Sequence, residues 1–148
     1  VRTMAEIAEE TERHIDYAKR FRTNEFVIHD RVDAISHATC GMAIDIGAKV
    51  IVVTSMSGMT VRMVSRFRAP TDIVGMATNK RVWYKLSLSW GVLPVLSEQF
   101  NSTDVLFYHA LRAARDTMHL QPGDNVVMTG GITNGKSGNT NLIKIEAV

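Results

Sequence analysis

Residues 50 to 60 read Val50-Ile51-Val52-Val53-Thr54-Ser55-Met56-Ser57-Gly58-Met59-Thr60, a β-branched run followed by a polar loop. Consecutive β-branched residues are typical of a strand that is covered on both faces, as in a parallel sheet. After the loop, apolar residues recur at helical spacing as far as Phe67, and Ala69-Pro70 ends the pattern. The stretch therefore predicts a strand, a polar loop and a helix in succession.

The same alternation of helices and strands extends along the rest of the chain. Upstream, the apolar spacing predicts an amphipathic helix from Met4 to Ile15, a connector at residues 21–29, and a helix from Asp30 to Ile46 that ends at Gly47. Downstream, we predict strands at residues 72–76, 92–96, 125–129 and 142–148, and helices at residues 79–89 and from the capping residues 102–104 to Met118. This alternation predicts an α/β fold. We expect a three-layer α/β/α sandwich around a mostly parallel five-stranded sheet whose last strand is antiparallel.

Length, composition and charge exclude several classes of protein. The chain has 148 residues, of which 45% are hydrophobic and 22% are charged, as expected of one compact domain. The net charge of +2 comes from Lys and Arg residues spread along the chain, so no nucleic-acid partner is expected. The single cysteine, Cys40, allows no internal disulfide, and no apolar stretch approaches the length of a membrane span. We expect a cytoplasmic protein with no membrane partner.

A second segment, Gly130-Gly131-Ile132-Thr133-Asn134-Gly135-Lys136-Ser137, matches the P-loop pattern G-x-x-x-x-G-K-[ST]. A P-loop binds phosphate from the start of a helix, whereas the next residues, Gly138-Asn139-Thr140-Asn141, are typical of a turn. A glycine-rich connection between two antiparallel strands explains the same residues. An enzyme that binds a nucleoside triphosphate at Gly130–Ser137 stays an alternative.

The polar loop after the first strand has a composition suited to phosphate. Ser55, Ser57 and Thr60 supply hydroxyl groups around Gly58. They lie at the start of the predicted helix, where backbone N–H groups carry partial positive charge. Capping of the helix by Ser57 is the plainer interpretation, and the two roles can coexist.

Other residues that could carry chemistry have simpler structural explanations. His37 and Cys40 have metal-ligand spacing on one helix, but no further Cys or His lies near them in the sequence. Asp30 and Asp33 open the same helix, where carboxylates interact favourably with its dipole. We therefore expect no metal site in this chain.

Several motifs together resemble the C-terminal part of pyruvate kinase. In chain order they are Thr3-Met4, Glu10-Thr11-Glu12, Ile15-Asp16-Tyr17, Asp33-Ala34-Ile35-Ser36-His37-Ala38, the loop Ser55–Thr60, Arg66-Phe67-Arg68 with Pro70, Trp90-Gly91-Val92, Pro122-Gly123-Asp124 and Gly138-Asn139-Thr140-Asn141. The resemblance implies that residues 1–20 are a terminal helix attached to the catalytic (β/α)₈ barrel and that residues 21–148 are the regulatory domain. It also implies that the catalytic residues and the magnesium and potassium sites lie in the barrel. The fragment alone is then expected to be inactive, with no cofactor of its own, whereas the whole enzyme transfers a phosphoryl group from phosphoenolpyruvate to ADP.

The resemblance also implies a binding site for a phosphorylated effector, such as a sugar phosphate or a nucleotide. Ser55, Ser57, Gly58 and Thr60 would hold one phosphate, and a second loop with Lys136, Ser137, Gly138 and Thr140 would close over it. In the family, a Trp and an Arg before the last helix often hold a second phosphate, and Ser97-Glu98-Gln99-Phe100 contains neither. For Lys136, contact with the ligand and exposure to solvent stay equally open.

The last expectation concerns the association of this chain with other copies of itself. The resemblance implies a tetramer in the full-length enzyme, with this domain forming one of the interfaces. The predicted last strand, Leu142–Val148, is an apolar edge strand, so we expect self-association through it. A module that serves only assembly, with no ligand, is a further alternative.

Overall fold

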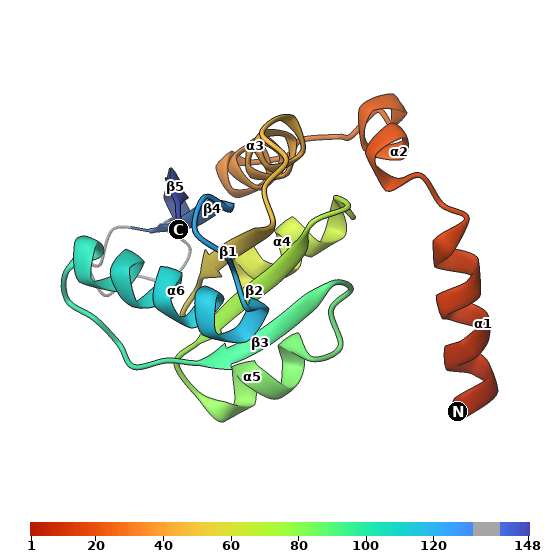
Figure 1. Ribbon diagram of the computed structural model, residues 1–148. Helices are drawn as coiled ribbons and strands as arrows, with labels where there is room; N and C mark the ends of the chain where they lie inside the picture. The colour runs from red at the N-terminus through yellow and green to blue at the C-terminus, as the bar shows by residue number, and fades with distance from the viewer. Residues whose placement is uncertain (132–139) are drawn as a thin grey trace.

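The computed structural model describes residues 1–131 and 140–148. Its helices and strands alternate along the chain, as the sequence predicts (Figure 1). The elements in order are α1 (Arg2–Arg13), α2 (Tyr17–Thr23), α3 (Arg31–Asp45), β1 (Val50–Thr54), α4 (Met59–Arg66), β2 (Asp72–Ala77), α5 (Lys80–Leu86), β3 (Val92–Leu96), α6 (Thr103–Met118), β4 (Asn125–Gly131) and β5 (Thr140–Ala147).

The strands form one sheet in the order β3-β2-β1-β4-β5. Strand β1 lies at the centre and pairs in parallel with both β2 and β4, while β3 extends the parallel set beyond β2. Strand β5 pairs antiparallel with β4 at the other edge. The predicted mixed sheet with an antiparallel last strand is therefore confirmed.

Helices cover both faces of the sheet and create two hydrophobic cores. One core contains Ile51, Val53 and Val127 from the sheet, packed against residues of α3, α4 and α5. The other contains Val50, Val52 and Met128, packed mainly against α6. Because successive residues of a strand point to opposite faces, a strand in the middle of such a sandwich is apolar on both sides. All five residues of β1 are buried, and the predicted α/β/α layers are confirmed (Figure 1).

Local signals in the sequence explain where helix α3 begins and ends. The Asp30 carboxylate accepts a hydrogen bond from the Asp33 amide at 2.9 Å, which caps the start of α3. After the helix, Gly47 adopts a φ of +61°, a left-handed conformation that glycine takes without strain. The predicted boundaries of this helix therefore agree with the structure to within about a residue.

The segment before α3 differs from the prediction. The first helix ends at Arg13 rather than at Ile15, and a second short helix, α2, occupies part of the predicted connector at residues 21–29. An aspartate at residue 16 caps α2 by accepting a hydrogen bond from the Lys19 amide at 2.9 Å. Phe21 on α2 is buried against other aromatic rings, so packing stabilises a helix too short to show clear periodicity. The predicted division after residue 20 falls inside α2.

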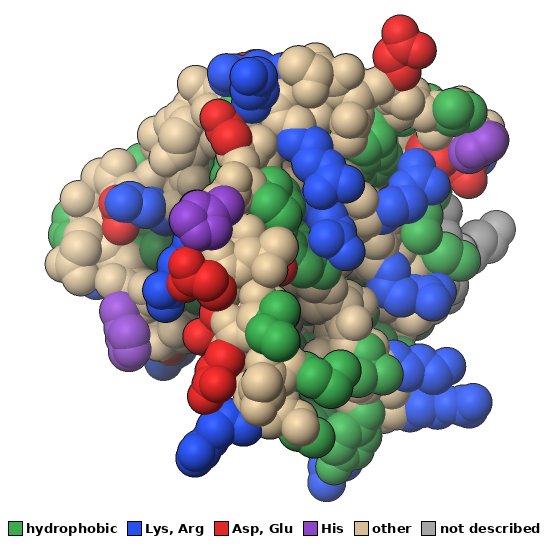
Figure 2. Space-filling model, turned by 90° about the vertical axis from the view of Figure 1, so that its right-hand side faces the viewer, with side chains coloured by type: hydrophobic (Ala, Val, Ile, Leu, Met, Phe, Trp, Pro, Cys, Tyr) green, Lys and Arg blue, Asp and Glu red, His purple; other side chains and the backbone are tan. Residues whose placement is uncertain are grey.

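Helix α1 extends away from the sheet (Figure 1). None of its residues is buried, and Met4 and Ile7 are 74% and 61% exposed. Figure 2 views the molecule from this side and shows hydrophobic side chains open to solvent beside Lys and Arg side chains. No helix in the described part of the chain is both long and apolar enough to cross a membrane.

Candidate functional site

The loop at residues 55–58 leaves the sheet at the point where the strand order reverses. The chain runs from β1 to β2 on one side of β1, whereas β4 lies on its other side. The carboxyl ends of β1 and β4 are therefore neighbours, as the register of Val53 with Thr129 shows. Open α/β sheets commonly bind ligands outside the carboxyl ends of their strands at such a switch point.

Gly58 fixes the geometry with which this loop enters α4. Its φ of +75° is left-handed, and a Cβ atom added to it would lie 2.9 Å from Cγ1 of Val82 and 3.2 Å from Cδ2 of Leu86. The backbone thus approaches α5 more closely than a side chain allows. This close packing holds the first turn of α4 at the edge of the sheet.

The predicted phosphate ligands lie around this first turn. Gly58 is the N-cap residue and offers no side chain, so the turn depends on its neighbours. Ser57 is exposed and its hydroxyl accepts a long hydrogen bond, 3.4 Å, from the Met59 amide. Ser55 is half-buried in the same loop. The predicted capping role of Ser57 is therefore wrong, because Gly58 occupies the N-cap position and no side chain caps this helix. The loop nevertheless keeps hydroxyl groups beside the positive end of a helix.

Thr60 lies deeper than the sequence indicates. It is 3% exposed, and its hydroxyl is 2.6 Å from the hydroxyl of Thr140, at the start of β5. The first turn of α4 and the first residue of β5 are thus joined by a buried hydrogen bond. The two segments that the sequence analysis assigned to one ligand site meet at this pair.

Two further threonines extend the polar contacts at this edge. The Thr54 hydroxyl donates to the Thr129 carbonyl at 3.4 Å, and the Thr129 hydroxyl donates to the Leu142 carbonyl at 2.9 Å. These bonds connect the ends of β1, β4 and β5. The sequence analysis did not single out Thr54 and Thr129, because a threonine in a strand is ordinary and their partners are distant in sequence.

The second predicted loop lies mostly outside the described part of the chain. Lys136, Ser137 and Gly138 lie outside the described residues, and of the four predicted there only Thr140 is described. The described chain resumes at Thr140 as strand β5, paired antiparallel with β4. The P-loop interpretation of Gly130–Ser137 requires a helix after the motif and is therefore wrong. The alternative of a connection between antiparallel strands agrees with the pairing.

A positive charge lies one turn into α4. A guanidinium nitrogen of Arg62 is 3.9 Å from the sulfur of Met59, whose side chain is 45% exposed. Met56 in the loop is also partly exposed, at 37%. Arg62 is thus a cation within reach of the loop, and the two methionines give its rim an apolar character.

The residues that the sequence analysis assigned to structural roles occupy such positions. The His37 ring stacks on Phe21 with ring centroids 4.9 Å apart, and the Cys40 thiol is directed at the Val64 carbonyl at 3.6 Å. Burial raises the pKa of the Cys40 thiol to about 12, so this group stays protonated at neutral pH. Asp33 is buried and pairs with Arg66 at 3.2 Å, which connects α3 to α4.

Comparison with known proteins identifies the family. The family model described as "Pyruvate kinase, alpha/beta domain" matches residues 33–146. Proteins named pyruvate kinase match the whole chain at 36% identity in Clostridium acetobutylicum, 31% in Lactobacillus delbrueckii subsp. bulgaricus and 32% in Staphylococcus saprophyticus. The chain spans only 32%, 26% and 25% of the lengths of these relatives. The chain therefore belongs to the family of the pyruvate kinase α/β domain.

Proposed function

We propose that this chain is the regulatory domain of a pyruvate kinase and binds a phosphorylated small molecule at the loop between β1 and α4. The observation that carries the proposal is the hydrogen bond of Thr60 with Thr140, which joins the first turn of α4 to the start of β5 at the switch point of the sheet. This is the position at which open α/β sheets bind ligands.

The first turn of α4 supplies the chemistry that a phosphate group requires. Backbone N–H groups at a helix start have no partners within the helix and carry partial positive charge. The Ser55 and Ser57 hydroxyls add further donors, and glycine at position 58 lets an anion approach the backbone closely. Arg62 contributes a full charge one turn away, with the planar donors that suit phosphate oxygens.

The proposed ligand carries one tightly held phosphate, as a sugar monophosphate or a nucleoside monophosphate does. The loop has one helix start and one neighbouring guanidinium, which match a single phosphate group. The segment Ser97-Glu98-Gln99-Phe100 before α6 carries no cation to hold a second one. Lys136 lies outside the described residues and would modulate the affinity rather than determine it.

The role of the ligand is allosteric in this proposal. The catalytic barrel belongs to the rest of the full-length enzyme, and the ligand favours one arrangement of the domains and subunits over another. The arrangement then sets the affinity of the barrel for phosphoenolpyruvate. This chain alone transfers no phosphoryl group.

Thermal unfolding in the presence of candidate ligands tests the proposal. At a concentration of 100 times Kd, a ligand that binds only the folded state adds about 2.7 kcal/mol of stability. For a domain of this size this corresponds to a rise in Tm of about 5 to 10 °C. Sugar phosphates and AMP should produce such a rise without Mg²⁺. Stabilisation by ATP that depends on Mg²⁺ and releases phosphate would contradict the proposal.

A pair of serine variants locates the site. Ser57→Ala should weaken the ligand-induced rise in Tm, because it removes a hydroxyl from the loop. Ser102→Ala is the matched control, since Ser102 is the exposed N-cap residue of α6 and makes no side-chain capping bond. Equal losses in the two variants would place the ligand elsewhere.

Self-association through β5 is the second part of the proposal. Both edges of the sheet are open strands, but β3 carries Pro94, whose carbonyl accepts a hydrogen bond from the Trp83 indole at 2.8 Å. Proline and an occupied carbonyl disfavour pairing with another strand at that edge. Strand β5 has Ile145 47% exposed and no proline, so it is the better partner for a second copy of the chain.

Two lysine substitutions, one in each edge strand of the sheet, test which strand pairs with a second copy of the chain. Ile145→Lys should reduce the mass in solution toward the monomer, whereas Leu93→Lys, at a 44% exposed position of β3, should leave it unchanged. Ile143 is a poorer site for this test because it packs against the core next to α3. An unchanged oligomer in Ile145→Lys would remove the assembly role of β5.

A further inference from the structure

The loop before β3 connects α1 and α2 to the end of α4 through Trp90. The Trp90 indole N–H donates to the Glu12 carboxylate on α1 at 2.6 Å, and the Trp90 ring lies 4.9 Å from the Tyr17 ring at the start of α2. The Trp90 carbonyl accepts a hydrogen bond from the Ser65 hydroxyl on α4, also at 2.6 Å. One residue thus contacts the N-terminal helices with its side chain and α4 with its backbone.

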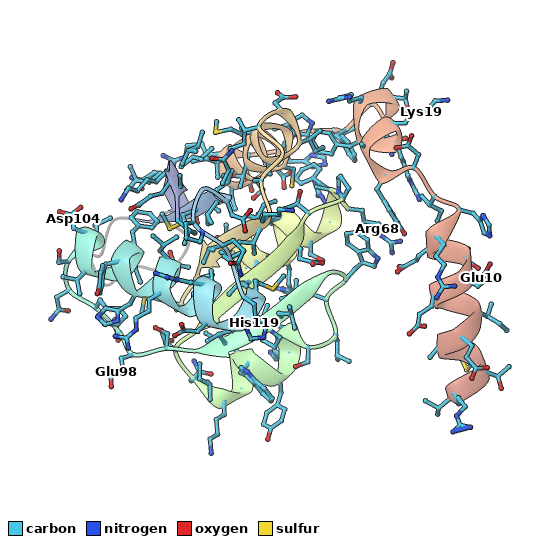
Figure 3. All side chains as sticks on the ribbon, viewed as in Figure 1. Glu10, Lys19, Arg68, Glu98, Asp104 and His119 are labelled. Carbon is cyan, nitrogen blue, oxygen red and sulfur yellow. The ribbon has the colours of Figure 1, made fainter. Side chains whose placement is uncertain are left out.

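A cation completes this junction, which we define as Glu12, Tyr17, Ser65, Arg68 and Trp90. The guanidinium carbon of Arg68 lies 5.6 Å from the centre of the Trp90 ring, a distance typical of a cation–π contact. Figure 3 shows Arg68 on the side of the domain that faces α1. The junction therefore lies at the C-terminal end of α4. The loop at residues 55–58, which we call the phosphate loop, lies at the opposite end of this helix.

Helix α4 connects the loop to the junction as a short, well-packed element. It has eight residues, which corresponds to a length of about 12 Å. Val61 and Val64 on its inner face are fully buried, and Ser65 is 5% exposed. A close-packed interior leaves little room for the helix to deform, so a shift at one end moves the other end with it.

Two features of the junction carry a local cost in free energy. The Tyr17 hydroxyl is buried, and none of the described residues offers it a hydrogen-bond partner. Arg68 adopts a φ of +49°, which is unfavourable for a residue with a side chain. An unpartnered buried hydroxyl and a left-handed backbone each cost free energy. A rearrangement of the junction that gives the Tyr17 hydroxyl a partner or relaxes Arg68 would recover part of this cost.

We infer that Trp90 couples the phosphate loop to α1 through α4, so that the state of the loop changes the contact between Trp90 and Glu12. This inference deepens the proposed function, because it assigns the path by which the ligand site acts on α1. Because such a coupling is reciprocal, we expect that breaking the contact of Glu12 with Trp90 loosens the first turn of α4 as well. This consequence can be measured without any ligand.

Hydrogen exchange of the first-turn amides tests the coupling directly. The Arg62 amide is bonded to the Gly58 carbonyl at 3.2 Å and reports opening of this turn. In Glu12→Ala, exchange at Arg62 should be at least about fivefold faster, the lower bound of typical coupling factors. Glu9→Ala changes another exposed glutamate of α1 and should leave this rate unchanged. Urea unfolding of both variants shows whether global stability stays the same.

Two results of this experiment would overturn the inference. One is an unchanged exchange rate at Arg62 in Glu12→Ala. The other is an equal increase at all amides of the domain with a matching loss of global stability, because that would show general destabilisation rather than coupling.

Titration with inorganic phosphate separates the inference from the proposed function. In Trp83→Phe, Trp90 is the remaining tryptophan, so its fluorescence reports the junction while calorimetry reports binding. Binding with a change in Trp90 emission that Ser65→Ala abolishes supports both proposals. Binding without any change in emission overturns the coupling alone. Absence of binding, together with faster exchange in Glu12→Ala, overturns the proposed ligand and leaves the coupling supported.

Discussion

Replacement of Gly58 by alanine tests whether this residue fixes the start of α4. Gly58 has a φ of +75°, and an added Cβ would lie 2.9 Å from Cγ1 of Val82 and 3.2 Å from Cδ2 of Leu86. The substitution therefore has two separate costs. It imposes a left-handed backbone on an L-residue, and it forces a methyl group against two side chains of α5.

The magnitude of each cost follows from the surroundings of Gly58. The left-handed backbone costs about 1 to 2 kcal/mol for an L-residue. Overpacking adds about 1 to 3 kcal/mol, and Leu86 has little room to move because it is 1% exposed. Alanine regains about 0.4 to 1 kcal/mol by reducing the entropy of the unfolded chain. We expect a net loss of about 1 to 5 kcal/mol in the free energy of unfolding.

Urea unfolding of Gly58→Ala and Gly47→Ala separates the two costs. Gly47 has a φ of +61°, and no described heavy atom lies within 4 Å of its added Cβ, so Gly47→Ala carries the backbone cost alone. Gly58→Ala should therefore be less stable than Gly47→Ala by about 1 to 3 kcal/mol. Equal losses of unfolding free energy in the two variants would show that Val82 and Leu86 move aside to accommodate the methyl group. The conclusion that close packing against α5 positions the loop would then be refuted.

Three further predictions concern buried groups near α4. Thr60→Val should cost about 1 to 3 kcal/mol in urea unfolding, because it leaves the buried Thr140 hydroxyl without this partner, and Thr60→Ser should cost much less. Asp33→Ala should cost about 1 to 3 kcal/mol by removing the buried partner of Arg66, whereas Asp45→Ala, which removes an exposed partner 3.7 Å from Arg22, should cost under about 1 kcal/mol. Because the folded pKa of Cys40 is raised to about 12, the stability that it contributes is complete below pH 9 and is lost as the pH rises toward 12. The Cys40→Ala variant should not show this loss of stability when its urea unfolding is measured between pH 9 and pH 12.

The layers of the fold could be predicted because the signals for them are local. The β-branched run Val50–Val53 and the strand Val92–Leu96 carry their pattern within a few residues, and the structure places both in the parallel sheet. The turn chemistry of Asp30 and Gly47 is equally local. Residues next to each other in sequence fix these features, so no knowledge of the tertiary structure is needed.

The contacts that complete the candidate site could not be predicted in the same way. Thr60 and Thr140 are 80 positions apart, and neither residue has a pattern that indicates a buried hydroxyl pair. The contact of Trp90 with Glu12 joins residues 78 positions apart, on segments whose distance depends on how α1 leaves the domain. Such pairs follow from the register of the sheet and the packing of helices on it. A single sequence specifies these only through the complete fold.

The glycine-rich stretch at the end of β4 shows why a motif must be judged by the element that follows it. A P-loop presents unpaired backbone N–H groups to phosphate from the start of a helix. Here Gly130 and Gly131 belong to β4 and are paired with Leu142 and Thr140 of β5. A side chain at Gly130 would also collide with the Thr54 hydroxyl on the neighbouring strand. Close approach of β1 to β4 therefore explains this glycine without a nucleotide, and the helix start that lies at this edge of the sheet is that of α4.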